Sequence, residues 1–347
     1  MNHRIAVLPG DGIGSEVTVE GVKVLRAAER GMDGVHFDLE EYSVGAGEYL
    51  KSGDPLPPAS MAKIMACDAI LLGAMGLPEV RRPNGTEIAP QLDLREQMEL
   101  YCGLRPVKLY HAQDTPLKRY GPGEIDFAIV RESTEGLFFS RKESYPPDAA
   151  EVRDTMRISR VGAERVIRSA FHAARKRRKR CTLVDKANVL PSMAYFRSIF
   201  YQIALEVPDV RADHVYVDAA ALYLVQRPDD FDVMVTENMF GDILSDLAAA
   251  LVGGMGMAPS ADIGDKHAVF QPAHGSAPDI MGKGIANPVA TILSVAMMLD
   301  WLGYPDAGRR IESAVERVFA DPSARTRDMG GALSTSEMGS RIEAALS

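Results

Sequence analysis

Short apolar runs alternate with longer segments of helical periodicity along most of the chain. The runs are rich in Val, Ile and Leu, and runs of this length are typical of buried strands. Because strand-like and helix-like segments alternate, the pattern predicts an α/β fold with a large, mostly parallel sheet covered by helices. Strands are expected at 4–8, 68–72, 125–130, 182–184, 215–217 and 231–235.

The segments between these runs repeat apolar residues at helical spacing, bounded by Gly, Pro or Asp, which commonly start or stop helices. Helices are expected at 14–30, 89–100, 160–177, 190–205, 241–251 and 288–302. The stretch 135–155 fits neither pattern, because Phe138 and Phe139 stand there among charged residues without helical spacing. We expect an extended arm, and exposed aromatic side chains on such an arm indicate a surface for a partner.

The composition is that of an ordinary globular protein. Of the 347 residues, 46% are hydrophobic and 25% are charged, which excludes a disordered or collagen-like chain. This length allows two domains or one large α/β unit. The formal net charge is −9, so the overall field repels polyanions, and an anionic substrate requires a local cluster of cations.

The cysteines and the N-terminal sequence bear on the setting in which the protein works. Cys67, Cys102 and Cys181 are far apart and in no metal-binding spacing, so we expect neither disulfides nor a zinc site but a reducing, cytoplasmic setting. Residues 1–4 lead directly into an apolar run, so no signal or transit peptide is expected. No apolar run approaches the ~18 residues of a membrane span, so no membrane partner is expected.

A pair of carboxylates is the first candidate for chemistry. Asp242 and Asp246 are four residues apart at the start of a predicted helix, which places both on one face. Carboxylate oxygens suit Mg²⁺ or Mn²⁺, and a cation between two like charges relieves their repulsion. The alternative is a solvated acidic face near a helix N-terminus. Asp218, after the predicted strand 215–217, is a candidate third ligand or a helix cap.

Three arginines form a second candidate group. If Arg95, Arg105 and Arg131 converge, they suit a substrate with two carboxylates, because a guanidinium binds a carboxylate through two hydrogen bonds. Arg131 directly follows a predicted strand, and strand ends are where α/β sheets bind ligands. For each arginine the alternative is a surface ion pair.

Lys186 also follows a predicted strand. A lysine held near arginines and a divalent metal ion gives up its proton more readily and can act as a base at neutral pH. The alternative is an exposed lysine that forms a salt bridge with Asp185.

Two glycine-containing segments are candidates for cofactor binding. Segment 9–14 follows the first strand and opens a helix, but its glycines lack the GxGxxG spacing of the dinucleotide-binding fingerprint. Segment 274–288 is a loop of small residues before a Pro-started helix, which permits close backbone approach to a ligand. If this loop holds an adenosine, Asp279 would accept hydrogen bonds from the ribose hydroxyls and favour NAD over NADP.

The basic run 175–180 raises the question of nucleic-acid binding. It lies at the end of a predicted helix, where cations complement the carbonyl end of the helix dipole, and no aromatic residues interleave it for base stacking. We interpret it as a solvated surface and expect no nucleic-acid partner, with RNA binding as the alternative.

Taken in order, these motifs resemble those of the β-decarboxylating dehydrogenases, the family of isopropylmalate, isocitrate, homoisocitrate and tartrate or D-malate dehydrogenases. The resemblance covers essentially the whole chain and is greatest to the 3-isopropylmalate dehydrogenases. Besides Asp218, the segments that carry it are 8–14, 94–95, 104–106, 131–136, 185–188, 241–246, 274–288 and 327–331.

The resemblance implies a two-domain α/β fold in which both chain termini share one domain. Residues 1–100 and 253–347 would form the cofactor-binding domain, and residues 101–252 the dimerisation and substrate domain. The arm, about 136–157, would intertwine with the arm of a second subunit in a homodimer. Each active site would then take Lys186 and Asp218 from the neighbouring subunit.

The resemblance also implies a reaction, the NAD- and metal-dependent oxidative decarboxylation of a (2R)-hydroxy acid with a carboxylate at C3. Lys186 would take the hydroxyl proton, and Mg²⁺ or Mn²⁺ would be held by Asp218, Asp242 and Asp246. The implied substrate contacts are Arg95, Arg105, Arg131, Gln91, Leu92 and Phe138. The implied cofactor contacts are His274, Gly275, Ser276, Ala277, Asp279, Ile280, Asn287 and Asn188.

One departure from the family pattern concerns the proton that replaces the lost CO₂. The family has a tyrosine seven residues beyond the third arginine that helps protonate the enol, whereas this chain has Phe138. A phenyl ring cannot donate a proton, so water, Lys186 or another residue such as Tyr145 would have to substitute.

A second departure concerns the substrate pocket. Isopropylmalate enzymes have an apolar pocket before the first arginine, whereas Gln91 stands four residues before Arg95 here. An unpaired buried amide costs roughly 1–3 kcal/mol, so Gln91 suits a hydroxyl, a carboxylate or a small substituent better than an isopropyl group.

These departures keep other activities open. The enzyme alternatives are D-malate or tartrate dehydrogenase first, then isocitrate or homoisocitrate dehydrogenase, although 89–91 do not reproduce the Ser-x-Asn of the isocitrate enzymes. The non-enzyme alternative is a catalytically silent binding subunit that keeps the fold without the chemistry.

Overall fold

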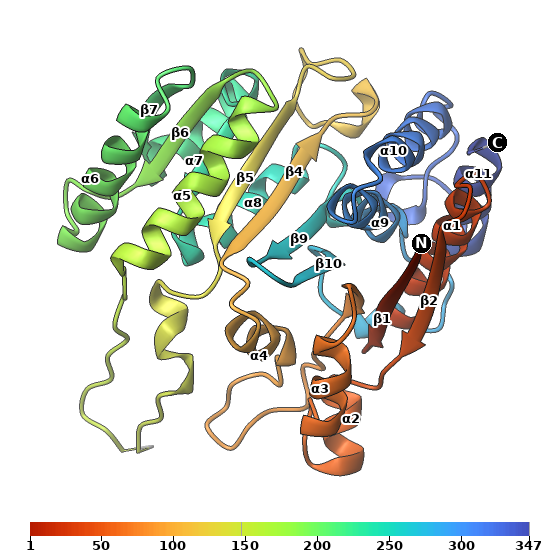
Figure 1. Ribbon diagram of the computed structural model, residues 1–347, viewed down its shortest axis with the longest axis horizontal. Coiled ribbons are helices and arrows are strands. Elements are labelled where there is room, and N and C mark those ends of the chain that lie inside the picture. Colours follow the sequence, from red (N-terminus) through yellow and green to blue (C-terminus); the bar gives the residue numbers. More distant parts are fainter. Residues whose placement is uncertain (147, 347) are drawn as a thin grey trace.

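The computed structural model describes residues 1–146 and 148–346, so residue 147 of the expected arm and residue 347 of the expected cofactor-binding domain lie outside the described residues. The strands are β1 Asn2–Gly10, β2 His36–Glu41, β3 Ala69–Ala74, β4 Cys102–Lys108, β5 Asp126–Glu132, β6 Arg180–Asp185, β7 Arg211–Tyr216, β8 Val233–Thr236, β9 Pro259–Ile263 and β10 Ala268–Pro272. They form a single sheet with helices on both faces, which confirms the predicted α/β fold (Figure 1).

The α-helices are α1 Gly14–Glu29, α2 Ala46–Ser52, α3 Pro58–Met65, α4 Pro90–Gln97, α5 Arg160–Arg175, α6 Pro191–Glu206, α7 Val217–Gln226, α8 Asn238–Ala250, α9 Val289–Trp301, α10 Pro305–Phe319 and α11 Thr335–Ala345. The short 3₁₀ helices are η1 Ala112–Asp114, η2 Leu137–Lys142, η3 Pro228–Asp230, η4 Met255–Met257, η5 Pro278–Ile280 and η6 Arg327–Met329. Within the described residues, none of these helices is both long and apolar enough to span a membrane.

The sheet consists of two parallel groups that run in opposite directions. Its strand order is β2-β1-β3-β10-β9-β4-β5-β8-β6-β7. Strands β2, β1, β3 and β10 are parallel to one another, and so are β5, β8, β6 and β7. Strands β9 and β4 join the groups through antiparallel pairs. The sheet is therefore mixed, with its change of direction at the centre.

The predicted elements correspond to observed ones with two notable differences. Strand β7 ends at Tyr216, where its pairing with β6 ends, and Val217 starts a helix because alanine-rich residues 219–221 favour helix. Asp218 therefore lies in a first helical turn and not at a strand end. Helix α4 ends at Gln97, before the predicted residue 100, because Glu99 has a left-handed φ of 51°.

Alternate residues of each strand pack against different helix layers, as side chains of a strand point to opposite faces. Val130 of β5 packs with α5 and α6, whereas Ile129 packs with α7 and α8. In the other half of the sheet, α1, α9, α10 and α11 cover one face, and α3 and α4 pack on the other. Arg131 follows Val130 and so shares the face of Ile129, toward α8.

The predicted arm begins at η2 and leaves the body of the molecule. Its base is closed by an antiparallel bridge between Gly136 and Arg157, and the chain between η2 and α5 extends away from the sheet (Figure 1). Phe139 and Tyr145 of this segment are exposed.

A buried ion pair attaches the C-terminal part of the chain to η1. Arg325 donates from Nε and Nη2 to the two carboxylate oxygens of Asp114, at 2.8 and 2.9 Å, and both side chains are only 2% exposed. Removing one partner of such a pair leaves an uncompensated buried charge.

We expect Asp114→Asn to destabilise the fold by about 3–5 kcal/mol, because the Arg325 guanidinium then lacks its counter-charge. The shift of the unfolding midpoint in guanidinium chloride measures this loss. Asp306→Asn, which breaks the exposed pair with Arg309, is the matched control and should leave the midpoint unchanged. Equal midpoints for the two variants would contradict the assignment.

Candidate active site

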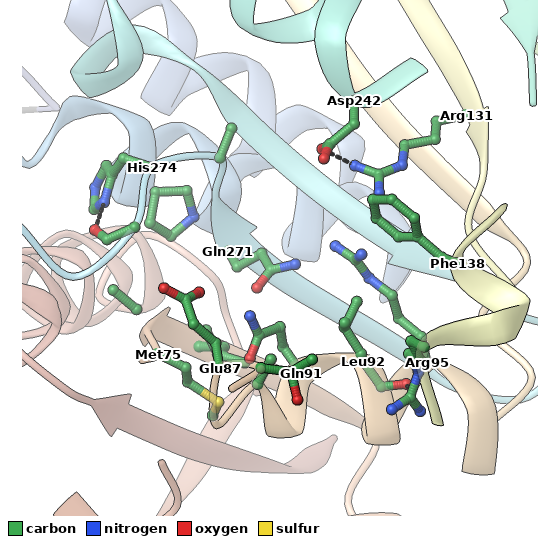
Figure 2. Close-up of a pocket in the computed structure, with 18 of the residues that line it drawn as sticks. Met75, Glu87, Gln91, Leu92, Arg95, Arg131, Phe138, Asp242, Gln271 and His274 are labelled. Carbon is green, nitrogen blue, oxygen red and sulfur yellow. Dashed lines mark hydrogen bonds and ion pairs between the residues drawn. The ribbon is translucent and has the colours of Figure 1, made fainter. Parts of the chain in front are cut away.

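A cavity of about 360 Å³ lies between α4 and α8, on the face of the sheet that carries Arg131 (Figure 2). The ends of β3 and β10 line one side, and β4, β5, η2 and α8 contribute the other. Of the residues expected at the site, those that line the cavity are Gln91, Leu92, Arg95, Arg105, Arg131, Phe138, Asp242, His274 and Gly275.

The three predicted arginines converge on this cavity and are buried there. The antiparallel register of β4 and β5 pairs Gly103 with Arg131 and so places Arg105 and Arg131 on one face of the sheet. Arg95 reaches the same cavity from α4. The surface ion pairs considered from the sequence are therefore excluded for these three residues.

Few anions compensate these arginines. Arg131 donates from Nε to Asn238 Oδ1 at 2.9 Å and from Nη1 to Asp242. Burial, and then repulsion from Arg95 and Arg105, lowers the pKa of Arg131 to about 10. Burial also lowers the pKa of Arg105, whose Nε is buried without a hydrogen-bond partner among the described residues. The cavity is thus prepared for anionic groups of a ligand.

Asp262 of β9 is the buried carboxylate behind this cluster. Its Oδ2 accepts from Arg95 Nε at 3.0 Å and from Gln271 Nε2 at 2.6 Å, and Oδ1 accepts from Ser133 Oγ at 3.3 Å. The residue is 1% exposed. Asp262 therefore holds the side chains of Arg95 and Gln271 in place at the cavity wall.

Helix α8 presents the predicted carboxylate pair. Its N-terminus is capped by Glu237, whose side chain accepts from Phe240 N at 2.6 Å. Asp242 lines the cavity, and Asp246 follows one turn later on the same face. The surrounding protein, and then the nearby charge of Asp242, raises the pKa of Asp246. A cation between the two carboxylates would reverse this effect.

Lys186 and Asp218 form an ion pair with each other. Lys186 Nζ donates to Asp218 Oδ1 at 2.8 Å, and this bond lowers the pKa of Asp218. The expected alternative partner, Asp185, is buried and bound instead by Arg197. Neither Lys186 nor Asp218 is among the residues that line the arginine cavity, and Asn188 is exposed nearby on the same loop. No group of three potential metal-ligating side chains occurs within the described part of a single chain.

The predicted cofactor loop is attached to the β1–α1 turn. Ser276 O accepts from Ile13 N at 2.8 Å, and a Cβ at Gly12 would lie 2.0 Å from that oxygen, so only glycine fits there. Ala277 and Ile280 pack near Ile13. Further along the loop, Glu16 accepts from the backbone N–H groups of residues 282 and 284. These contacts fix the loop beside the cavity.

Three side chains of this loop are candidates for binding a ligand, and they differ in whether the protein already bonds them. His274 Nδ1 donates to Gly275 O at 2.9 Å, and Nε2 is buried without a partner among the described residues. Burial lowers the pKa of His274, so its ring stays neutral and Nε2 remains an acceptor. Asp279 is exposed, and the buried Asn287 donates to Asp328 at 3.3 Å.

Two functional residues were missed by the sequence analysis. Asp262 of β9 lies opposite Val269 of β10, two residues before Gln271, so Asp262 and Gln271 are diagonal neighbours on one face of the sheet. Their signal was a polar residue inside each of the short apolar runs 259–263 and 268–272. A polar residue in a buried strand requires a partner, but a single sequence does not say which strands are neighbours.

Arginines of the basic run 175–180 form salt bridges with aspartates of the same chain. Arg175 pairs with Asp209, Arg177 with Asp126 and Asp232, and Arg180 with Asp213. These contacts favour the interpretation of this run as surface over a nucleic-acid site.

The fold and the site define an α/β enzyme with a cavity for a polyanionic ligand next to a glycine-rich loop. Residues 4–342 match the model of the isocitrate/isopropylmalate dehydrogenase family, and the chain belongs to that family. The expectation of an NAD-dependent oxidoreductase of the β-decarboxylating type is confirmed.

Individual relatives cover the full chain. The chain is 45% identical to a 3-isopropylmalate dehydrogenase of Corynebacterium efficiens over 99% of both sequences, and 44% identical to one of Thermotoga maritima over 98% of both. Among solved structures, an isocitrate dehydrogenase of Methylococcus capsulatus superposes with a TM-score of 0.88 at 39% identity, with 99% of each chain covered. A β-decarboxylating dehydrogenase of Thermococcus kodakarensis gives a TM-score of 0.82 at 38% identity, over 99% of this chain and 96% of that one.

Asp262→Asn removes the buried charge behind the arginines while keeping the size of the side chain. We expect it to destabilise the free protein by about 3–5 kcal/mol, which lowers the melting temperature by several degrees. Because the arginines then lack an anion, added malonate should raise the melting temperature of the variant more than that of the wild type.

Asp265→Asn, at an exposed site after β9, is the matched control for this experiment. It should melt at the temperature of the wild type and respond to malonate as the wild type does. The same malonate response in Asp262→Asn as in the wild type would show that Asp262 does not balance the arginines.

Proposed function

We propose that the protein catalyses the NAD- and metal-dependent oxidative decarboxylation of a (2R)-2-hydroxy acid with a second carboxylate at C3, as in 3-isopropylmalate. The observation that carries this proposal is the convergence of three buried arginines on a cavity bordered by the carboxylate of Asp242. The names of the full-length relatives support it.

The net reaction balances without a further reagent. The substrate dianion and NAD⁺ give a 2-oxo acid monoanion, CO₂ and NADH. The proton lost by the C2 hydroxyl is balanced by the proton that C3 gains after its bond to the carboxylate breaks. The protein must therefore hold two carboxylates, remove one proton and return one proton.

Arg95, Arg105 and Arg131 hold the two substrate carboxylates. Their guanidinium groups are buried, so the charge-assisted hydrogen bonds that they donate are little weakened by water. Asp262 and Asn238 fix the orientation of Arg95 and Arg131. This fixed geometry favours a dicarboxylate over a monocarboxylate.

The residues of α8 fit a divalent metal ion. Asp242 and Asp246 offer carboxylate oxygens on one helix face, the donor type that Mg²⁺ and Mn²⁺ prefer, and Asp218 of a second subunit would complete the set. A metal ion held there would supply polarisation of the oxygen at C2, and bound NAD⁺ would supply the hydride acceptor.

The loop after β10 fits the adenosine end of NAD. Asp279 is exposed and would accept hydrogen bonds from the ribose hydroxyls, and its charge disfavours a 2′-phosphate. His274 offers an Nε2 that has no partner among the described residues, and Gly275 leaves open space where a Cβ would stand. Ser276, Ala277, Ile280 and Asn287 shape the loop, and Asn188 is a further contact from the neighbouring subunit.

Lys186 is the proposed base, acting in the active site of a second subunit together with Asp218. The pair lies away from the arginine cavity of its own chain, which supports this sharing. Exposed apolar residues on α7 and α8, Leu222, Val225 and Ile243, support a homodimer interface near it. The arm, about 136–157, would contribute Phe139 to the same interface.

Phe138 cannot return the proton to C3. It lines the cavity with its ring 5.3 Å from the Arg131 guanidinium. Tyr145 bonds Glu143 and the Arg153 carbonyl within the arm and is not among the residues that line the cavity, so it is a poor substitute. Water or Lys186 remains as the proton donor.

We also propose the two-domain division into 1–100 with 253–347 and 101–252. The four largest clusters of buried apolar residues support it. The cluster under α1, α9, α10 and α11 and the cluster under α3 and α4 contain buried residues of 1–100 and 253–347 alone, and the clusters under α5 and α6 and under α7 and α8 contain buried residues of 101–252 alone. The buried, unpaired cysteines support a cytoplasmic setting.

The purified protein, supplied with NAD⁺ and Mn²⁺, should form NADH and CO₂ in equal amounts from 3-isopropylmalate or D-malate. EDTA should abolish turnover, and Mn²⁺ should restore it. Asp246→Asn should raise the Mn²⁺ concentration for half-maximal activity by at least about tenfold, whereas Asp306→Asn, at an exposed site, should not. CO₂ release without matching NADH, or full activity in EDTA, would contradict the proposal.

A further inference from the structure

The side chain of Gln91 lines the cavity, and its amide oxygen has no hydrogen-bond donor among the described residues. Gln91 lies in the first turn of α4, one turn before Arg95 on the same helix face. Its Oε1 is buried without a hydrogen-bond partner among the described residues, whereas the residue as a whole is half-buried. A buried acceptor without a donor is destabilising, so a ligand group that donates to it gains affinity.

Gln271 brings a second amide to the same cavity in a fixed orientation. Asp262 accepts from Gln271 Nε2 at 2.6 Å, and a carboxylate can only accept, so the nitrogen of this amide must face Asp262. The oxygen of Gln271 is left as an acceptor at the cavity wall. Figure 2 shows Gln91 and Gln271 between Glu87 and Arg95.

A substrate held at the arginines and at Asp242 would turn its C3 substituent toward these two amides. An alkyl substituent leaves both amides unbonded and excludes the water that could bond them. A hydroxyl both donates and accepts, so it bonds the fixed oxygen of Gln271 and either end of the Gln91 amide.

A third carboxylate on the substituent finds no free cation on this side. Two further arginines line the cavity, but Arg82 pairs with Asp93, and Arg141 pairs with Asp93 at 2.8 Å and with Glu96 at 2.5 Å. Glu87 lines the same wall, and its carboxylate pairs with Arg81 at 3.1 Å. The charges therefore favour a neutral hydrogen-bonding group.

We propose that Gln91 and Gln271 are specificity-determining residues that select a C3 hydroxyl, so that the enzyme prefers 2,3-dihydroxy dicarboxylates to 3-alkylmalates. The inference rests on the proposed function and narrows its substrate class. The C2 hydride passes to NAD⁺, the C3–carboxylate bond breaks with its electrons kept by C3, and C3 takes a proton. The products are a 3-hydroxy-2-oxo acid, CO₂ and NADH.

The test compares kcat/KM for meso-tartrate, 3-isopropylmalate and D-malate, which carry hydroxyl, isopropyl and hydrogen at C3. The wild type should favour meso-tartrate over 3-isopropylmalate by at least about tenfold. Gln91→Leu should lower kcat/KM for meso-tartrate roughly tenfold to a hundredfold and raise it for 3-isopropylmalate, with D-malate changed much less.

Gln97→Leu makes the same chemical change on the exposed face of α4 and should leave all three values unchanged. If Gln91→Leu does not fold, the ratio measured for the wild type decides alone. A preference of the wild type for 3-isopropylmalate over meso-tartrate overturns this inference and leaves the proposed function intact. No NADH from any of the three substrates overturns both.

Discussion

The site depends on three buried arginines that lie close together, of which only two have a carboxylate as a hydrogen-bond partner among the described residues. Asp262 compensates Arg95, and Asp242 bonds Arg131, while Arg105 has only a long hydrogen bond to Ser245 at 3.4 Å. Buried like charges repel, so this arrangement is stable only because β4, β5 and α4 are fixed by the sheet and its cores. The proposed dianionic substrate would bring further negative charge to these arginines and so gain affinity from them.

The topology of the sheet explains why residues from both of its halves line one cavity. The change of strand direction at β9 and β4 brings α8 and α4 onto one face, so that the carboxylates of one helix stand opposite the arginine of the other. The loop after β10 borders the same cavity and carries His274 and Asp279. The proposed anion, metal and cofactor sites thus lie together where the two parallel groups of strands meet.

The local features of this site could be predicted from the sequence, whereas its pairings could not. The spacing of Asp242 and Asp246 by one helical turn is a local property, and the structure has it. The convergence of Arg95, Arg105 and Arg131 depends on the register of β4 against β5, which no apolar pattern specifies. Strands β4 and β9 were not predicted at all, and for this reason Asp262, the partner of Arg95, was missed as well.

The two departures from the family pattern concern the residues expected near the C3 substituent and near the proton that C3 gains. Phe138 stacks on Arg131 and keeps its charge in a fixed place but supplies no proton. Gln91 and Gln271 make one wall of the cavity polar, whereas an alkyl substituent would require an apolar wall. The proposed binding of the carboxylates and the proposed choice of the C3 substituent therefore rest on different features of this chain, the first on charge and the second on hydrogen bonding.

The central claim is that the arginine cavity of one subunit works with Lys186 and Asp218 of the other. Mixing Lys186→Ala subunits with Asp242→Asn subunits, under conditions that exchange partners, tests it most directly. Each variant alone should be inactive, and the mixture should recover about a quarter of wild-type activity, because half of the dimers are mixed and each of these has one intact site. A mixture no more active than its parents would contradict the account.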